Sequence, residues 1–172
     1  GMGGIKSVGV GAVQEIVRAR TEGGVFKDLV DFCNRVSMRI VNKRVVENLI
    51  RSGAMDGFDA NRAQLLTIMD QAIEQGSAYQ KDAESGQMGL FDDTNVFQIN
   101  DIKLPPMKEL PKALMLQQEK ELLGFYVSGH PLSAYENVLR SYTPLYQFLG
   151  ENCNLEDGTY VKVAGIISEC NL

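Results

Sequence analysis

The chain has 172 residues, 44% hydrophobic and 23% charged, a composition typical of a soluble globular protein of one domain or two small ones. Its apolar runs are only a few residues long, which excludes a transmembrane helix, and without a charged and apolar leader we expect a cytoplasmic protein. Three cysteines lie far apart and form no Cys-x-x-Cys pair, which argues against a disulfide scaffold and a structural zinc site.

The net charge of −5 averages two unlike parts of the chain. Residues 1–62 carry ten Lys and Arg against seven acids, a balance of +3, whereas residues 63–172 carry −8. Because phosphate contacts need Lys and Arg, a nucleic-acid contact is expected in the first part only. The acidic remainder is better suited to a protein partner.

Short helices joined by glycine-containing turns are predicted for residues 1–75. Apolar residues at helical steps indicate one helix over residues 11–21 and a second between residues 26 and 36. Asn42 is expected to cap a third helix, and Gly53 to supply the left-handed turn at its end.

A longer fourth helix is predicted to begin at a capping-box-like pair, Asn61 and Gln64. The helical period is lost at about Gly76, and one Lys faces five acids between residues 76 and 102. Residues 76–104 therefore read as an acidic linker that is too polar to bury a core of its own.

A second helical region, a bridge, is predicted over residues 105–150. A stripe of apolar residues indicates a helix over residues 111–128, which Gly129 is expected to end. Ser133 and Glu136 form a capping box for a further helix.

Period-two alternation occurs only at residues 160–167, where it predicts a strand. One strand is not stable alone, so either it pairs with an earlier segment or the chain stops just inside another domain. We favour the second interpretation and assign residues 151–172 to the truncated start of that domain. The expected fold class is mainly α.

No catalytic or metal site is recognisable in the sequence. The only histidine, His130, precedes a proline in an apolar context and is interpreted as a turn or packing residue. Asp92 and Asp93 are adjacent in the linker, where such a pair is usually solvated. With neither a Gly-x-Ser-x-Gly motif nor a Walker loop present, we expect no catalytic residue, metal ligand or cofactor.

The residues before the first predicted helix form a candidate phosphate site. An apolar-Gly-apolar-Gly turn aims backbone N–H groups and the positive helix end at an anion, and Lys6 adds charge. Such a site would hold a nucleic-acid backbone without reading bases. The alternative is a tight turn whose glycines are needed for positive φ. The predicted contacts are Lys6, Ser7, Val8, Gly9, Val10 and Gly11.

A second, degenerate copy of this turn follows about 44 residues later, around Gly53. It has Asp56 where the second glycine would fall, and because this acid should repel phosphate the second turn is expected mainly to pack. Arg51, Gly53 and Arg62 are nevertheless predicted as further backbone contacts, although exposed arginines are more often only solvated.

One apolar island interrupts the acidic linker. Exposing Leu90 and Phe91 there would be costly unless something covers them. One interpretation is a short linear motif that docks on a protein partner, and the other is that the island folds back onto the chain's own helices. The predicted partner-binding residues are Gln87, Met88, Gly89, Leu90 and Phe91.

Several segments resemble one family, the bacterial replicative DNA polymerase III alpha subunit. Residues 4–9 (GIKSVG), 41–45 (VNKRV) and 49–54 (LIRSGA) resemble its region after the fingers. Residues 119–132 (EKELLGFYVSGHPL) resemble a signature of the same family and are the most specific match. The resemblance covers nearly the whole chain in the family's order.

This resemblance implies a tandem helix-hairpin-helix domain over residues 1–75 that contacts duplex DNA behind the active site. It implies that residues 87–91 dock on the sliding clamp, because they fit the family's Gln-x-x-Leu-Phe pattern, and that residues 160–167 begin an OB-fold. It also places the catalytic carboxylates and their Mg²⁺ upstream of residue 1. The chain would then be a non-catalytic fragment whose partners are duplex DNA, the clamp and the rest of the alpha subunit.

The leading hypothesis is therefore a DNA-binding and clamp-tethering module of a replicative polymerase. The runner-up is a stand-alone helix-hairpin-helix protein of DNA repair or recombination that carries a clamp motif. A purely structural helical scaffold would explain the acidic balance best, but it leaves the turn at residues 8–11 and the island at 90–91 without a role.

Overall fold

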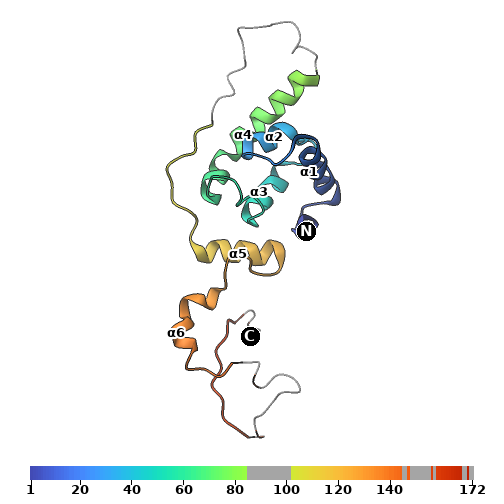
Figure 1. The fold of residues 1–172 in the computed structure, drawn as a ribbon. Coiled ribbons are helices and arrows are strands. Elements are labelled where there is room, and N and C mark those ends of the chain that lie inside the picture. The colour runs from blue at the N-terminus through green and yellow to red at the C-terminus, as the bar shows by residue number, and fades with distance from the viewer. Residues whose placement is uncertain (85–101, 145–146, 148–155, 157, 168–169, 171–172) are drawn as a thin grey trace. The chain divides into compact units, whose positions relative to one another are not determined.

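The computed structural model describes residues 1–84, 102–144, 147, 156, 158–167 and 170, which divide into two compact units, Gly1–Ser128 and Gly129–Leu172 (Figure 1). In chain order the helices are η1 (Met2–Gly4), α1 (Val10–Gly23), α2 (Leu29–Arg35), α3 (Lys43–Arg51), α4 (Arg62–Glu84) and α5 (Lys112–Leu123) in the first unit, and η3 (Pro131–Tyr135) and α6 (Glu136–Leu139) in the second. The described residues contain no strand. The predicted mainly α fold is confirmed, and the strand expected at residues 160–167 is not observed.

Two of the predicted helix starts are formed by the expected side chains. Asn42 Oδ1 accepts the backbone N–H of Val45 at 3.2 Å and caps α3. Asn61 and Gln64 form a reciprocal capping box, with N–H to side-chain oxygen distances of 2.9 and 2.8 Å. Each contact satisfies a backbone donor that has no partner within its helix.

The first unit has one core, which takes side chains from α1, α2, α3 and α4 and from the last turn of α5. Val36, Val46 and Ala72 have no exposed surface within it. Leu122 of α5 belongs to the same cluster, so residues that follow the linker pack with residues that precede it. The domain bounds expected from composition stay predictions.

Helix α4 continues past its predicted end at Gly76 to Glu84 (Figure 1), and it packs against α2 through contacts that include Gly76 and Gln80. At Gly76 the two helices are so close that a side chain would collide with the backbone carbonyl of Cys33. One turn later, Gln80 Nε2 donates to the carbonyl oxygens of Cys33 (2.9 Å) and Val36 (2.6 Å) at the end of α2. The helix is thus prolonged by contacts with its neighbour, and the glycine is a contact residue and not a stop signal.

Helix α5 ends at Gly124, which has a left-handed φ of 83°, so the predicted end at Gly129 is wrong. The chain then folds back on the helix. Glu119 Oε2 accepts the backbone N–H groups of Val127 (2.8 Å) and Ser128 (2.9 Å). Because a side chain takes these amides, the last predicted turn does not form.

The second unit begins with a short 3-10 helix. His130 Nδ1 accepts the N–H of Leu132 at 3.2 Å and caps η3, and Glu136 lies in the first turn of α6. The helix therefore does not start at the predicted capping box of Ser133 and Glu136. His130 acts at a turn, as the sequence indicated.

Candidate nucleic-acid interface

The loop between η1 and α1, residues 5–9, is held by the core of the first unit and by hydrogen bonds to α5 and α3. Ile5 and Val8 are both buried in the core. The N–H of Lys6 donates to the carbonyl of Leu122 on α5 at 2.9 Å, and the carbonyl of Lys6 accepts from Asn48 Nδ2 on α3 at 2.9 Å. The loop is therefore fixed in place although its Lys6 side chain lies at the surface.

Helix α1 starts in this loop without a side-chain cap. Its N-cap residue is Gly9, and no acidic residue lies in its first turn. The first N–H groups of a helix have no partner within the helix, and the helix dipole places partial positive charge there. Val10, the first helical residue, is 71% exposed, so this end of α1 faces solvent.

The two glycines of this turn are required neither by the backbone nor by packing. Gly9 has φ −72° and Gly11 lies within the helix, whereas Ser7 takes the left-handed conformation, with φ 65°. A Cβ atom added at either glycine would meet nothing within 4 Å. The alternative in which the glycines serve positive φ is therefore excluded, and their effect is to leave the helix end open to close approach.

The structure brings the predicted residues of the first hairpin together at this junction. Val8 is buried and can contribute backbone groups only. The others lie at the surface: Lys6, Ser7, Gly9, Val10 and Gly11.

The second hairpin is built differently from the first. Gly53 has φ 81°, and a Cβ atom there would collide with the guanidinium of Arg62. This guanidinium pairs with both carboxylate oxygens of Asp56, at 2.8 and 2.6 Å. The position that the sequence assigned to a degenerate phosphate turn is thus filled by an internal cation.

Arg62 is 1% exposed and cannot reach a phosphate, which corrects its predicted role as a DNA contact. Arg51 lies nearer the surface, where it pairs with Glu47 at 2.6 Å, and its carbonyl accepts from Arg62 at 3.2 Å. Gly53 serves the packing of Arg62. The second hairpin therefore mainly packs, as Asp56 indicated.

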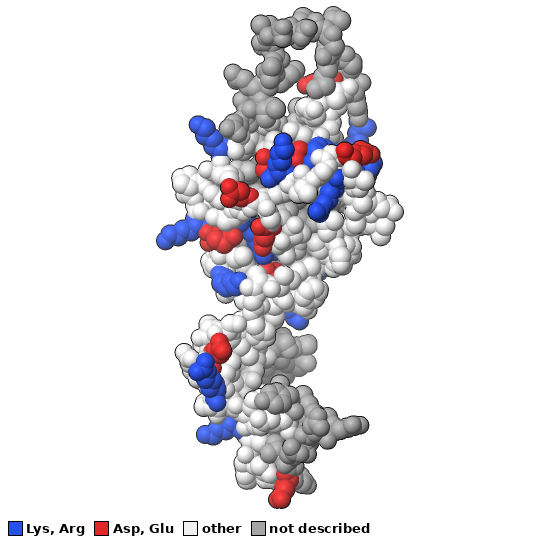
Figure 2. All heavy atoms as spheres, in the orientation of Figure 1, with Lys and Arg blue, Asp and Glu red and all other residues white. Residues whose placement is uncertain are grey.

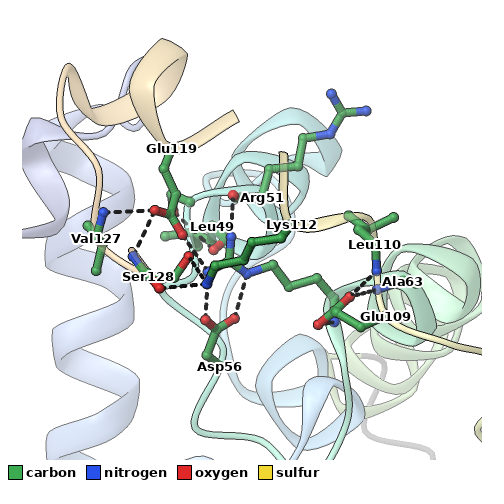
Figure 3. A network of polar contacts seen from close by, with 12 residues as sticks. Leu49, Arg51, Asp56, Ala63, Glu109, Leu110, Lys112, Glu119, Val127 and Ser128 are labelled. Atoms are coloured by element: carbon green, nitrogen blue, oxygen red, sulfur yellow. Dashed lines mark hydrogen bonds and ion pairs between the residues drawn. The ribbon is translucent and has the colours of Figure 1, made fainter. Parts of the chain in front are cut away.

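A buried carboxylate completes the surroundings of Arg62 (Figure 3). Glu119 of α5 has no exposed surface and pairs with Arg62 at 2.9 Å, while its other oxygen accepts the N–H groups of Val127 and Ser128. Burial alone would raise the pKa of Glu119, but these backbone donors and Arg62 outweigh it and lower the pKa to about 2. Glu119 is therefore an internal anion over the whole physiological range.

A second carboxylate ties the chain after the linker to the start of α4. Glu109 accepts the backbone N–H groups of Arg62 (3.0 Å) and Ala63 (3.2 Å), two donors that the helix itself cannot satisfy (Figure 3). Asn61 Nδ2 donates to the carbonyl of Met107 at 3.0 Å. Residues 105–110 thus run along the N-terminal start of α4.

Sequence reasoning missed this network because its partners are far apart in the chain. Arg62 and Glu119 are separated by 57 positions. The available signal was Glu119 itself, a charged residue that lies between Leu116 and Leu122 on the buried stripe of α5. A charge at such a position needs a partner.

Comparison with known proteins now adds to this geometry. The family model of the helix-hairpin-helix motif matches residues 1–65, which include both hairpins. DNA polymerase III subunit alpha of Vibrio cholerae is 39% identical over 168 residues, which is 97% of this chain, and that of Bacillus subtilis is 49% identical over 135 residues, or 78%. The chain is homologous to a segment of the DNA polymerase III alpha subunit.

This homology confirms the resemblance found in the sequence. The chain spans 14% of the length of the Vibrio cholerae relative and 12% of that from Bacillus subtilis, so it corresponds to a small part of each. The predicted clamp motif, Gln87-Met88-Gly89-Leu90-Phe91, lies outside the described residues.

The surface charge of the described residues is mixed. Figure 2 shows basic and acidic side chains interspersed over the face drawn. Ion pairs among the described residues include those of Arg18 with Glu15 and Glu22, Arg35 with Asp31, Lys43 with Asp70, Arg51 with Glu47, and Arg62 with Asp56 and Glu119. The +3 balance of residues 1–62 therefore does not form a continuous basic surface on this face, and phosphate binding would depend on the start of α1.

Neither a metal-binding cluster nor a membrane-spanning helix is found in the part of the chain that the structure describes. There, no group of His, Cys, Asp and Glu could hold a metal ion. No described helix is both long and apolar enough to cross a membrane. Cys33 is fully buried, and burial raises the pKa of its thiol to about 12, so it is not a reactive nucleophile.

Proposed function

We propose that this chain is a non-catalytic region of a replicative DNA polymerase that holds duplex DNA by its phosphate backbone. The observation that carries the proposal is the start of α1, where an uncapped, acid-free helix end is left open by two glycines that the fold does not need. The helix-hairpin-helix match over residues 1–65 supports the same assignment. The chemistry of the polymerase, with its Mg²⁺, would then lie outside these residues, and the whole protein would act in the cytoplasm.

The binding mode follows from the groups at this end of α1. Backbone N–H groups would donate to phosphate oxygens, and the exposed Lys6 would add one cationic contact. Neither group reads bases, so the affinity should not depend on sequence. With so few charges engaged, binding should be weak, and it should be lost as salt is raised.

We further propose that residues 87–91 tether the polymerase to its sliding clamp. The proposal rests on the sequence pattern, in which Leu90 and Phe91 would enter an apolar pocket and Gln87 would form a hydrogen bond. A weak motif suffices because the DNA held by α1 passes through the same clamp, which raises the effective concentration of the two partners. We expect micromolar affinity, roughly −8 kcal/mol or weaker.

The DNA proposal is tested by Gly11→Ala, measured by fluorescence anisotropy with a labelled duplex at low ionic strength. Alanine favours helix and its Cβ meets no atom of the chain, so the free energy of unfolding should stay unchanged or rise by up to about 1 kcal/mol. Duplex affinity should nevertheless fall roughly tenfold, because the added methyl group would hinder the close approach of a phosphate to the N–H groups. This loss is about that of one charge-assisted hydrogen bond.

The control is Gly57→Ala, since Gly57 is also exposed with no atom near its missing side chain but lies away from α1. It should leave duplex affinity unchanged. Equal affinities for the wild type, Gly11→Ala and Gly57→Ala would refute the assignment of α1 as the phosphate site.

The clamp proposal is tested by calorimetry of the 172-residue chain with the cognate clamp. Leu90→Ala/Phe91→Ala should abolish the binding heat while the unfolding transition stays unchanged. Binding of the double variant with wild-type affinity would contradict the motif assignment.

The structural scaffold is the second candidate, and the ion pairing of the basic side chains favours it. It predicts no retention of duplex at any ionic strength. The stand-alone repair or recombination protein lacks comparable support, because the relatives matched over most of the chain are polymerase subunits by name.

A further inference from the structure

The buried ion pair of Arg62 and Glu119 lies next to a backbone contact between α5 and the loop of the first hairpin. In this contact the N–H of Lys6 donates to the carbonyl of Leu122. Glu119 and Leu122 are three residues apart, on neighbouring positions of one helical turn. Glu119 is bound to Arg62 at the start of α4, and the carbonyl of Leu122 accepts the N–H of Lys6. The two contacts therefore connect the second hairpin to the first through α5.

We infer that Glu119 is a positioning residue for the phosphate site at the start of α1. It fixes the last turn of α5 through Arg62, and that turn fixes Lys6 and the loop that leads into the helix. This inference rests on the proposed DNA binding for its functional meaning, but the coupling itself can be measured without DNA.

Glu119 is suited to this role because each of its oxygens is used. One oxygen faces Arg62, and the other accepts two amides of the chain that returns after Gly124 (Figure 3). Separating a buried ion pair leaves each charge in the interior without its partner, which is costly. The contact between α5 and the start of α4 should therefore resist opening. On the far side, Asp56 holds Arg62 through both of its oxygens.

The geometry also separates positioning from direct contact. Glu119 has no exposed surface and cannot touch DNA. Replacing it by glutamine removes one negative charge, which by long-range electrostatics alone would strengthen the binding of a polyanion. A weaker affinity in this variant must therefore come from the shape of the site.

The test compares the wild type, Glu119→Gln and the control Ile68→Val, which removes one methylene from the α2–α4 core away from this contact. Amide hydrogen exchange is read at Lys6, and duplex affinity is read by anisotropy over a range of salt.

Glu119→Gln should speed exchange at Lys6 beyond the change seen elsewhere and weaken duplex binding about three- to tenfold. The salt slope should stay unchanged, whereas Lys6→Gln should lower it by about one. Ile68→Val should change exchange uniformly.

Several outcomes would overturn the inference. Glu119→Gln that folds and binds duplex as tightly as the wild type, or more tightly, contradicts it, and so does unchanged exchange at Lys6. If the wild type binds no duplex, the proposed function fails, and exchange at Lys6 still decides whether Glu119 holds the loop. Should Glu119→Gln not fold, Arg62→Lys breaks the same contact while keeping its charge, and it must show the same local acceleration at Lys6.

Discussion

At the scale of single residues, several charged side chains of the described residues pair with one another. Arg62 was expected at a DNA surface and instead lies inside, between Asp56 and Glu119. Of the predicted phosphate contacts, the exposed Lys6 and the backbone amides at the start of α1 remain the best suited. No acidic residue lies in the first turn of α1 to repel a phosphate. The proposed phosphate site is thus defined more by the open backbone at the start of α1 than by a concentration of charge.

The buried carboxylate gives a pH dependence of stability with a definite sign. The pKa of Glu119 is about 2 in the folded chain against an ordinary value of 4.5, so its contribution is complete above pH 4.5 and is lost as the pH falls toward 2. A shift of this size corresponds to up to about 3 kcal/mol. Urea unfolding of the wild type between pH 5 and pH 2 should show this loss, roughly between those limits, and Glu119→Gln should show a flatter curve. Parallel curves for the two proteins would mean that Glu119 is not the internal anion described.

At the scale of helices, local signals located the starts of α3 and α4 and the left-handed turn of Gly53 after α3, but not the ends of α4 and α5 or the start of α6. Asn42, and Asn61 with Gln64, begin α3 and α4 as their sequence predicts, because capping uses residues three positions apart. The ends of α4 and α5 depend on Gln80 and Glu119, whose partners lie elsewhere in the fold or in a turn that reverses direction. The first hairpin was predictable for the same reason that the capping boxes were, since its groups are local. The internal role of Arg62 was not predictable, because its buried partner Glu119 lies on another helix, 57 positions away.

The close contact of α2 and α4 yields a prediction at this scale. A Cβ atom at Gly76 would collide with backbone atoms of Cys33, which cannot move aside as a flexible side chain could. Gly76→Ala should therefore lower the free energy of unfolding by about 1–3 kcal/mol, despite the higher helix propensity of alanine. Gly57→Ala, which meets no atom, is the control and should change it by less than about 0.5 kcal/mol. A Gly76→Ala chain as stable as the wild type in urea unfolding would show that the two helices are further apart.

At the scale of the molecule, the proposed function combines two weak contacts, one with duplex DNA and one with the sliding clamp. In the proposed function, the first unit offers one open helix end to a phosphate backbone, on a surface where several basic side chains are paired with acids. The linker carries a short apolar motif in acidic surroundings. Neither contact needs to be strong if the clamp and the duplex are held together, because the second binding event is then intramolecular. Homology to a segment of DNA polymerase III alpha subunits agrees with a part that assists a catalytic centre located elsewhere.

Duplex binding at the start of α1 can be tested by titrating the isotope-labelled chain with a short duplex at low salt and following the amide chemical shifts. The largest shifts should fall on Lys6 and residues 9–12, and they should disappear as salt is raised. Amides around Gly53 and Asp56 should change little, because the second hairpin is occupied by Arg62. Shifts centred on residues 51–56, or none anywhere in residues 1–75, would contradict the account.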